Sequence, residues 1–390
     1  MKINLQTGSY GAVKFRCDIV CAKTGRTIKR GREQTNLLFD QGLNNLATMS
    51  WPALFNYFVL GTGTTPTRRD SGVITFTRAG SVVTASANFF EAADVGRLLK
   101  FDSGEEMYVT GFTSGTEVSV NLSGSLAASE GTIYYVNRTS LGNESKRTNT
   151  LTSDSGDHGF SWNGTTGVLS TWKTMIFAAE TGTVTYREIG WSHAGSGANT
   201  INGAALLAGG GDTLVADQQY KVRLQLDRVI SPRTPRALAT ADVVDLWSGS
   251  AEELIEMVGL DVWRTNGDAG PVTNQGTSGL EPQTALNVTL DQTSAALNPP
   301  APVPFNPSGS VVIHQLNMTA AAYTSGAFYR DYTGVFSPTQ GNSTLIRSLR
   351  VGSFGADRFF RLLMDAPQTK TSSQKLTLRF RKSWGRVLVN

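Results

Sequence analysis

Short runs of alternating apolar and polar residues, each closed by glycine, serine, aspartate or asparagine, constrain this chain more than any other feature. Between about residue 73 and residue 138 these runs read VITFTRAG, SVVTASANFF, GRLLKFD, EEMYVTGF, TEVSVNLSG and TIYYVNR. A period of two is the pattern of a half-buried β-strand, and this dense spacing of strands is typical of a small barrel or sandwich. We therefore expect an independent, β-barrel-like module at 73–138.

Similar runs continue on both sides of this segment, so the sequence predicts an all-β fold. Charged residues make up only 17% of the chain and glycines number 41, which favours short strands and tight turns over helices. We expect a β-sandwich domain at 1–236, with the module inserted in it, and a second β-sandwich domain at 237–390. The linker is SPRTPR at 231–236, because prolines resist both helix and sheet pairing. The proline-rich NPPAPVP at 298–304 is expected to be extended.

One hairpin and two short helices are also predicted. The run AVKFRCDIVCA should pair with TIKR through a turn at 23–26. Leu38, Leu43 and Leu46 lie near helical spacing, and Asn36 can cap the start, which predicts a helix from about 37 to 48. Further on, SAEE is a capping box that leads into ELIEMV, and Gly259 is placed to end this second helix.

The two predicted domains share a sequence pattern. TMIFAAETGTVTYREIGWS resembles TGVFSPTQGNSTLIRSLRVGS, with Phe177 matching Phe336, and QYKVRLQL parallels QKLTLRF, with Val222 matching Leu376. This similarity favours two copies of one sandwich in which both phenylalanines point inward. The alternative, that any two strand-turn-strand sequences look alike, stays open.

The charge distribution does not favour nucleic acid as a partner. The net charge is +4 and the pI about 9.0, but 35 basic residues are set against 31 acidic ones without a long run of like charges. Near the C-terminus, basic residues alternate with Leu378, Phe380 and Trp384, which is typical of the solvated face of a strand. These basic residues are Arg379, Arg381, Lys382 and Arg386.

The two cysteines are expected to be free. Cys17 and Cys21 would lie on one face of a strand with their Cα atoms about 13 Å apart, whereas a disulfide needs Cα atoms within about 7 Å. The simplest interpretation of the two cysteines is that both are buried free thiols in a protein made in a reducing cytoplasm. The N-terminus lacks an uninterrupted apolar stretch and no run approaches 18 apolar residues, so we expect neither a signal peptide nor membrane insertion.

The histidines do not point to a metal site. His158, His193 and His314 are scattered, and none has a second histidine, cysteine or carboxylate at a convincing ligand spacing. His158 is the least ordinary of them because Asp154 and Asp157 lie nearby, but the surrounding glycines and serines indicate a loop. The sequence therefore predicts no metal-binding and no cofactor-binding residue.

The carboxylates do not form an obvious hydrolytic pair either. Glycoside hydrolysis needs two carboxylates separated by about 5–10 Å. Glu105 and Glu106 are adjacent in a predicted strand and point to opposite faces. The acidic residues of the second predicted helix lie on its surface; they are Glu252, Glu253 and Glu256. We predict no catalytic residue and no enzymatic activity.

Three tryptophans could instead stack on sugar rings, but aromatic residues of this kind more often fill sandwich cores or subunit interfaces. They are Trp162, Trp191 and Trp263.

Several stretches resemble structural proteins of tailed-bacteriophage particles, of the tail, collar and fibre kind. NLLFDQGLNNLAT followed by YFVLGTGTTPT is similar to openings common in such proteins, as is AADVGRLLKFDSGEEMYVTGF, with REIGWS further on. The similarity spans roughly residues 30–230, and FRKSWGR near the C-terminus is a fainter echo.

The resemblance implies a virion protein made in the host cytoplasm that assembles as a symmetric homo-oligomer, a trimer by analogy with many phage appendages. Its partners would be other virion proteins at the neck, collar, tail or capsid. The alternative function is a receptor-binding or glycan-binding module at a fibre tip, with or without polysaccharide depolymerase activity. Coiled-coil heptads and a repetitive shaft would mark a long fibre, and the sequence contains neither.

Overall fold

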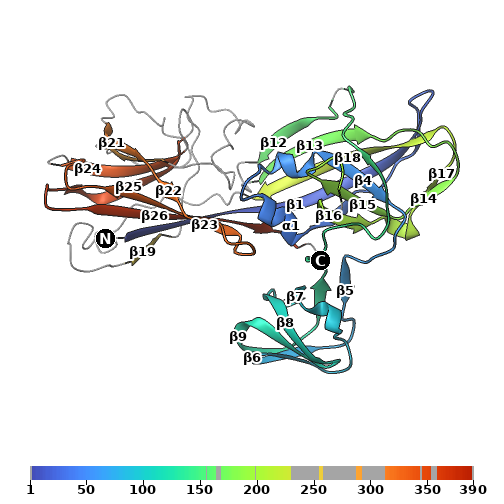
Figure 1. Cartoon of the computed structure of the whole chain (residues 1–390), viewed down its shortest axis with the longest axis horizontal. Helices are drawn as coiled ribbons and strands as arrows, with labels where there is room; N and C mark the ends of the chain where they lie inside the picture. The colour runs from blue at the N-terminus through green and yellow to red at the C-terminus, as the bar shows by residue number, and fades with distance from the viewer. Residues whose placement is uncertain are drawn as a thin grey trace.

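The computed structural model describes residues 2–154, 156–163, 168–197, 199–229, 254–257, 287–291, 312–342, 345–352 and 358–388. The predicted all-β fold is confirmed, because these residues form sheets of 14, six, four and two strands (Figure 1). None of these sheets closes into a barrel within the described ranges. The module is therefore an open sheet, and only its all-β character matches the barrel-like expectation.

The strand β1 (Lys2–Cys21) runs through most of the length of the molecule (Figure 1). Its 20 residues extend about 66 Å at 3.3 Å per residue. The second half pairs antiparallel with β18 (Gln218–Val229), whereas the first half pairs in parallel with β26 (Leu376–Arg386). The start of the chain thus joins a sheet to which the C-terminal segment also belongs. The predicted linker at 231–236 and the proline-rich segment at 298–304 lie outside the described residues.

The prediction of a second helix is wrong. Leu254–Met257 is the strand β19, which pairs in parallel with Lys2–Leu5 at the start of β1. A run as short as LIEM has too few residues for its hydrophobic periodicity to distinguish a helix from a strand. Here the backbone groups of the adjacent strand β1 need hydrogen-bond partners, and LIEM supplies them as a strand.

The first predicted helix is shorter than expected. The strand β3 (Gln34–Leu38) continues where the helix was predicted to begin, and α1 covers only Asp40–Asn45. Phe39 takes the N-cap position, and Asn36 lies inside β3. The predicted hairpin is confirmed, since β2 (Thr27–Lys29) pairs with Ile19 and Val20 of β1 and Gly25 takes a positive φ of 68° in the turn.

The path through the large sheet is β11-β4-β15-β16-β3-β1-β18-β13-β12. Its main core contains apolar side chains from several strands along this path, including Phe15 of β1, Trp191 of β15 and Leu224 of β18. The remaining strands of the path and the short elements attached to it are η1 (Pro52–Phe55), β4 (Tyr57–Gly61), β11 (Glu144–Thr148), β12 (Gly159–Asn163), β13 (Val168–Ile176), β14 (Val184–Tyr186), β15 (Glu188–Ser192), β16 (Ile201–Leu206), η3 (Ala208–Gly210) and β17 (Asp212–Leu214).

A separate six-stranded sheet projects from the large one (Figure 1). The flanking strands β4 and β11 pair directly with each other, so the chain leaves the large sheet after β4 and returns to it at β11. The projecting part has its own hydrophobic core, which includes Phe76, Leu99 and Val118. We call it the module; its elements are β5 (Arg68–Asp70), β6 (Phe76–Ala85), η2 (Ala92–Asp94), β7 (Leu98–Phe101), β8 (Glu106–Ser114), β9 (Glu117–Ser129) and β10 (Gly131–Tyr134).

The C-terminal segment contributes a four-stranded sheet of order β21-β20-β24-β25 and adds strands to the large sheet through β26. Its strands are β20 (Asn287–Asp291), β21 (Val312–Asn317), β22 (Thr319–Ala320), β23 (Tyr329–Phe336), β24 (Leu345–Gly352) and β25 (Arg358–Thr369).

The duplication of two sandwiches stays a prediction. Phe177 and Phe336 are both buried, as the duplication requires. Their pairings differ, however: Phe336 lies opposite Leu376, whereas the Phe177 N–H donates to the carbonyl of Tyr220, two residues before Val222. In addition, β1 is antiparallel to β18 but parallel to β26.

Replacing either phenylalanine with alanine should destabilise the fold by about 3 kcal/mol, because it removes a buried ring and leaves a cavity. Phe336 is 0% exposed, and its strand neighbour Val335, at 38% exposed, supplies a matched control. Urea unfolding should show a lower free energy for F336A and almost no change for V335A. Equal effects of the two variants would contradict the assigned packing of β23.

The prediction of two buried free thiols holds for Cys17 and is wrong for Cys21, which is only partly buried; both cysteines are free. Burial raises the pKa of the Cys17 thiol well above its ordinary value, with Asp212 and Asp18 adding to the effect. Cys21 lies at the end of β1, where the hairpin turn leaves it near solvent.

Candidate functional site

The loop around His158 is fastened to the large sheet. Asp154 Oδ2 and Asp157 Oδ2 both pair with Lys221 Nζ of β18, at 2.6 and 2.8 Å. Burial acts to raise the pKa of Asp157, but hydrogen bonds from Lys221 and Thr152 outweigh it and hold that pKa below its ordinary value. His158 Nε2 lies 2.6 Å from the Thr152 carbonyl oxygen. These contacts give the aspartates a structural role in holding the loop.

The other residues considered for chemistry are not brought together. Glu105 pairs with Arg78 at 3.2 Å and Glu106 with Lys100 at 3.8 Å. His193 Nδ1 lies within hydrogen-bond distance of the amide side chains of two asparagines of the large sheet and α1, Asn45 and Asn202.

Trp191 is fully buried in the main core, with Phe15 and Phe55 packed against it, so its ring is not available to a sugar. The side chains of several other candidates lie outside the described set: Trp162, Glu252, Glu253, Glu256, Trp263 and His314.

Within the described ranges, no three histidine, cysteine or carboxylate side chains are grouped so that they could hold a metal ion. The described helices also lack the combined length and hydrophobicity that a membrane crossing requires.

The most elaborate arrangement lies where the module meets the large sheet. Apolar side chains from the module, the large sheet and the end of β26 form one shared core, which we call the junction core. Its members are Leu37, Phe39, Val59, Leu98, Tyr134, Val136, Leu141, Ile201, Ala204 and Leu388. The module is thus packed against the sheet as well as covalently joined to it.

Polar contacts supplement the junction core. The Tyr108 hydroxyl of the module donates to Asp40 Oδ1 at 2.9 Å, and Arg386 of β26 pairs with the same carboxylate. Lys100 Nζ donates to the carbonyl oxygen of Leu388 at 3.3 Å. Burial raises the pKa of Tyr108, which Arg386 opposes and Asp40 reinforces, so the phenol stays protonated and remains a donor.

The expectation that all four basic residues of β26 face solvent is wrong for Lys382 and Arg386, which are buried. Both have the same parity as Leu378, Phe380 and Trp384, and side chains of one parity share a face of a strand. Parity alone could therefore have placed Arg386 on the inner face. Its partner, Asp40, lies 346 residues away and carried no such signal.

A buried carboxylate, Glu188, holds the two segments that connect the module to the sheet. Its oxygens accept hydrogen bonds from the Gly142 N–H at 2.8 Å, the Asn143 N–H at 3.3 Å and Arg138 Nη2 at 3.1 Å. Arg138 also donates to the carbonyls of Thr65 and Pro66 on the outgoing segment. We call this group the neck clamp.

Glycine is required beside the neck clamp. A Cβ atom at Gly63 would lie 2.4 Å from Glu188 Oε2 and 2.7 Å from the Asn143 nitrogen, closer than real Cβ contacts allow. The absence of a side chain lets the outgoing and returning segments close on the carboxylate.

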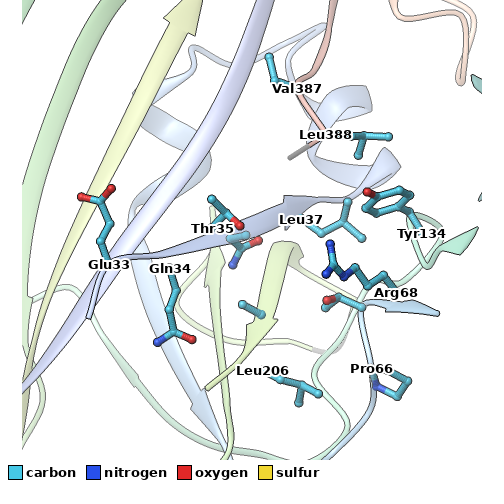
Figure 2. A pocket seen from close by; sticks show the side chains of 13 residues that line it. Glu33, Gln34, Thr35, Leu37, Pro66, Arg68, Tyr134, Leu206, Val387 and Leu388 are labelled. Carbon is cyan, nitrogen blue, oxygen red and sulfur yellow. The ribbon is translucent and has the colours of Figure 1, made fainter. Parts of the chain in front are cut away.

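A cleft of about 560 Å³ opens beside the junction core (Figure 2). It is bordered by β3, by the outgoing segment of the neck, by the end of β16 and by the residues that follow β26. We call it the junction cleft; its lining residues are Glu33, Gln34, Thr35, Asn36, Leu37, Pro66, Thr67, Arg68, Tyr134, Ala205, Leu206, Val387 and Leu388. These residues come from five distant parts of the sequence, so no local motif could reveal them.

The junction cleft combines apolar and polar groups. Figure 2 shows Leu37, Tyr134 and Leu388 on one side and Glu33 and Gln34 on the other. Glu33 is the one carboxylate among these lining residues, so a carboxylate pair for hydrolysis is not assembled there. The chemistry of the lining suits binding.

Comparisons with protein-family models, with curated proteins and with solved structures find no match for this chain. The interpretation of the fold and the site thus depends on their own geometry.

Proposed function

We propose that this protein is a structural subunit of a tailed-phage particle, made in the host cytoplasm, which acts by assembling as a symmetric homo-oligomer, most simply a trimer, with other virion proteins. The observation that carries the proposal is β1, which joins strands of the N-terminal and C-terminal segments in one 14-stranded sheet. A long shared strand resists bending between the parts it connects, because its many ladder hydrogen bonds would have to break together.

Three carboxylates, two of them buried and Asp40 partly buried, support a structural role. Glu188 holds the neck and Asp40 holds the module and β26, while a third carboxylate, Asp94, lies between Arg69 and Arg97 inside the module. In each case the carboxylate ties together segments that are distant in sequence or in different elements. This use of charge favours a rigid part over a catalyst.

One end of the large sheet offers a surface for self-association. Ile28 on β2 and Val215 in the turn before β18 are both exposed. Lys23 pairs with Asp217 at 2.6 Å and Lys29 pairs with Asp212, which ties the β1–β2 hairpin to the turn that carries Val215. Exposed apolar side chains between fixed ion pairs are suited to a subunit contact. We call this region the distal end.

Introducing glutamates at both apolar positions of the distal end should weaken self-association about tenfold or more, because charges would be desolvated in the contact. The I28E/V215E variant should therefore elute at a lower mass in size-exclusion chromatography with light scattering and should fail to enter particles. V73E is the control, since Val73 is 91% exposed on the module, away from the distal end.

Two results would contradict the proposal. The first is a protein that stays monomeric and does not attach to particles that lack it. The second is turnover of a host polysaccharide that is lost in a single carboxylate variant, which would favour the glycan-cleaving alternative.

A further inference from the structure

The hairpin of β1 and β2 carries the whole excess of positive charge of this chain. Residues 22–33, which we call the basic hairpin, hold five of the 35 basic residues and one of the 31 acidic residues, so 30 of each lie elsewhere. The five basic residues are all exposed; they are Lys23, Arg26, Lys29, Arg30 and Arg32. The positive charge is thus concentrated on one surface, which belongs to the distal end.

The three arginines of the basic hairpin are available to a partner. The two lysines already pair with the aspartates of the distal end, whereas the arginine side chains form no hydrogen bond or ion pair with the residues that the structure describes. The backbone that carries two of the arginines is held in place, because the Gly31 N–H between them donates to Asp18 Oδ1 at 3.0 Å. An arginine held in this way is suited to a carboxylate, which it can bind through two parallel hydrogen bonds.

The module has the opposite charge. From β5 to β10, residues 68–134, it contains five basic and eight acidic residues, a net charge of −3. Asp102 and Glu130 lie next to each other, since the Asp102 N–H donates to the Glu130 carbonyl oxygen at 2.9 Å. Both side chains are exposed, and neither carboxylate has an ion pair or hydrogen bond within the described ranges. The module therefore presents unpaired carboxylates that complement the unpaired arginines.

These two surfaces do not meet within one copy of the chain. Figure 1 shows the hairpin, in blue, at one extreme of the large sheet, whereas the module projects from the middle of the molecule. The neck clamp and the junction core hold the module in that place. A carboxylate partner for the basic hairpin must therefore come from another molecule.

We propose that the basic hairpin of one subunit binds the acidic surface of the module of the next subunit. This contact rests on the assembly proposed above and deepens it, because it names the partner of the distal end. A contact between two different surfaces, repeated around a rotation axis, closes into a ring in which every hairpin and every module is occupied. Hairpin-to-hairpin association would instead bring like charges together, which opposes binding.

The surroundings of the arginines favour a protein partner over a nucleic acid. Ile28 lies between Arg26 and Arg30 in the sequence and is 47% exposed. Nucleic acids bind basic surfaces chiefly through their phosphates, which offer no apolar counterpart to this side chain. The module does offer one, since Phe112 of β8 and Leu122 of β9 are 40% and 41% exposed.

The test compares charge reversals in the full chain by analytical ultracentrifugation. R26E/R30E makes the hairpin acidic, and D102K/E130K makes the module basic. Each variant alone places like charges opposite each other and should weaken self-association about tenfold or more. The variant with all four changes restores opposite charges with inverted polarity, so it should associate to within about threefold of the wild type. Circular dichroism checks that the variants are folded.

Two controls and a salt series accompany these variants. K375E reverses an exposed lysine just before β26, and V73E adds negative charge to the module, so both should keep wild-type association. Raising NaCl from about 0.1 M to about 1 M shortens the Debye length from about 10 Å to about 3 Å and should weaken wild-type association about tenfold.

The possible failures are distinguishable. A wild type that stays monomeric would overturn both the contact and the proposed function. A wild-type oligomer that survives both reversals would overturn the contact alone, as would a fourfold variant that fails to associate again, because the hairpin would then have another partner. If R26E/R30E keeps its oligomeric mass but loses binding to a fluorescent duplex DNA, the hairpin binds nucleic acid and the contact is likewise overturned.

Discussion

Replacing Asp94 with alanine should destabilise the module by about 5 kcal/mol, at the upper end of the cost of breaking a buried ion pair. Asp94 is 0% exposed, and its two oxygens pair with Arg69 at 2.6 Å and with Arg97 at 2.7 Å. It also accepts the Glu91 N–H at 2.8 Å, which closes the capping box of η2.

The loss is large because one carboxylate satisfies two partly buried guanidinium groups. Arg69 lies over the ring of Phe89 and Arg97 over that of Tyr135, so neither can easily turn out to solvent. Without Asp94, both cations would remain desolvated and without their main anionic partner.

Hydrogen exchange can locate the effect, because the module contains no tryptophan and is silent in tryptophan fluorescence. In D94A, peptides from β7, β8 and β9 should lose protection while those from β18 keep it. The control is E91A, since Glu91 also pairs with Arg69, at 2.6 Å, but its side chain is 61% exposed, and such pairs contribute about 1 kcal/mol or less. Equal effects of D94A and E91A would show that burial of the carboxylate does not set the cost.

The second large effect is expected at the neck clamp, where replacing Glu188 with alanine should destabilise the fold by about 4 kcal/mol. Glu188 is 1% exposed, and its removal leaves the Gly142 N–H without its acceptor and the Arg138 guanidinium without its carboxylate partner. The outgoing and returning segments of the module would then lose their common attachment to β15.

E188Q retains an acceptor oxygen and should therefore cost less than E188A. The matched control is E144A, because Glu144 forms an ion pair with Arg147 but its side chain is 36% exposed. Urea unfolding followed by tryptophan fluorescence gives the free energies, and limited proteolysis should cleave E188A at 62–67 or 137–143 first. Resistance of the neck to protease in E188A would show that the junction core alone holds the module.

The sequence by itself was sufficient for features set by neighbouring residues. Alternation with a period of two predicted the all-β fold, and glycine at the turn predicted the β1–β2 hairpin, because side-chain direction and turn conformation depend on a few adjacent residues. The same rule, applied to β26, would have placed Arg386 beside Trp384 on the buried face. The spacing of the cysteines likewise excluded a disulfide within β1.

Tertiary structure decided everything that depends on which strands become neighbours. LIEM became β19 because the start of β1 lay beside it, and α1 shortened because β1 and β16 pair with Gln34–Leu38 as β3. The junction core and the junction cleft each unite segments more than 100 residues apart, and the hydrogen bonds of the neck clamp join residues 45 to 73 positions apart. Backbone groups and buried charges must find partners wherever the fold brings them, and a linear sequence does not state which distant residue will supply them.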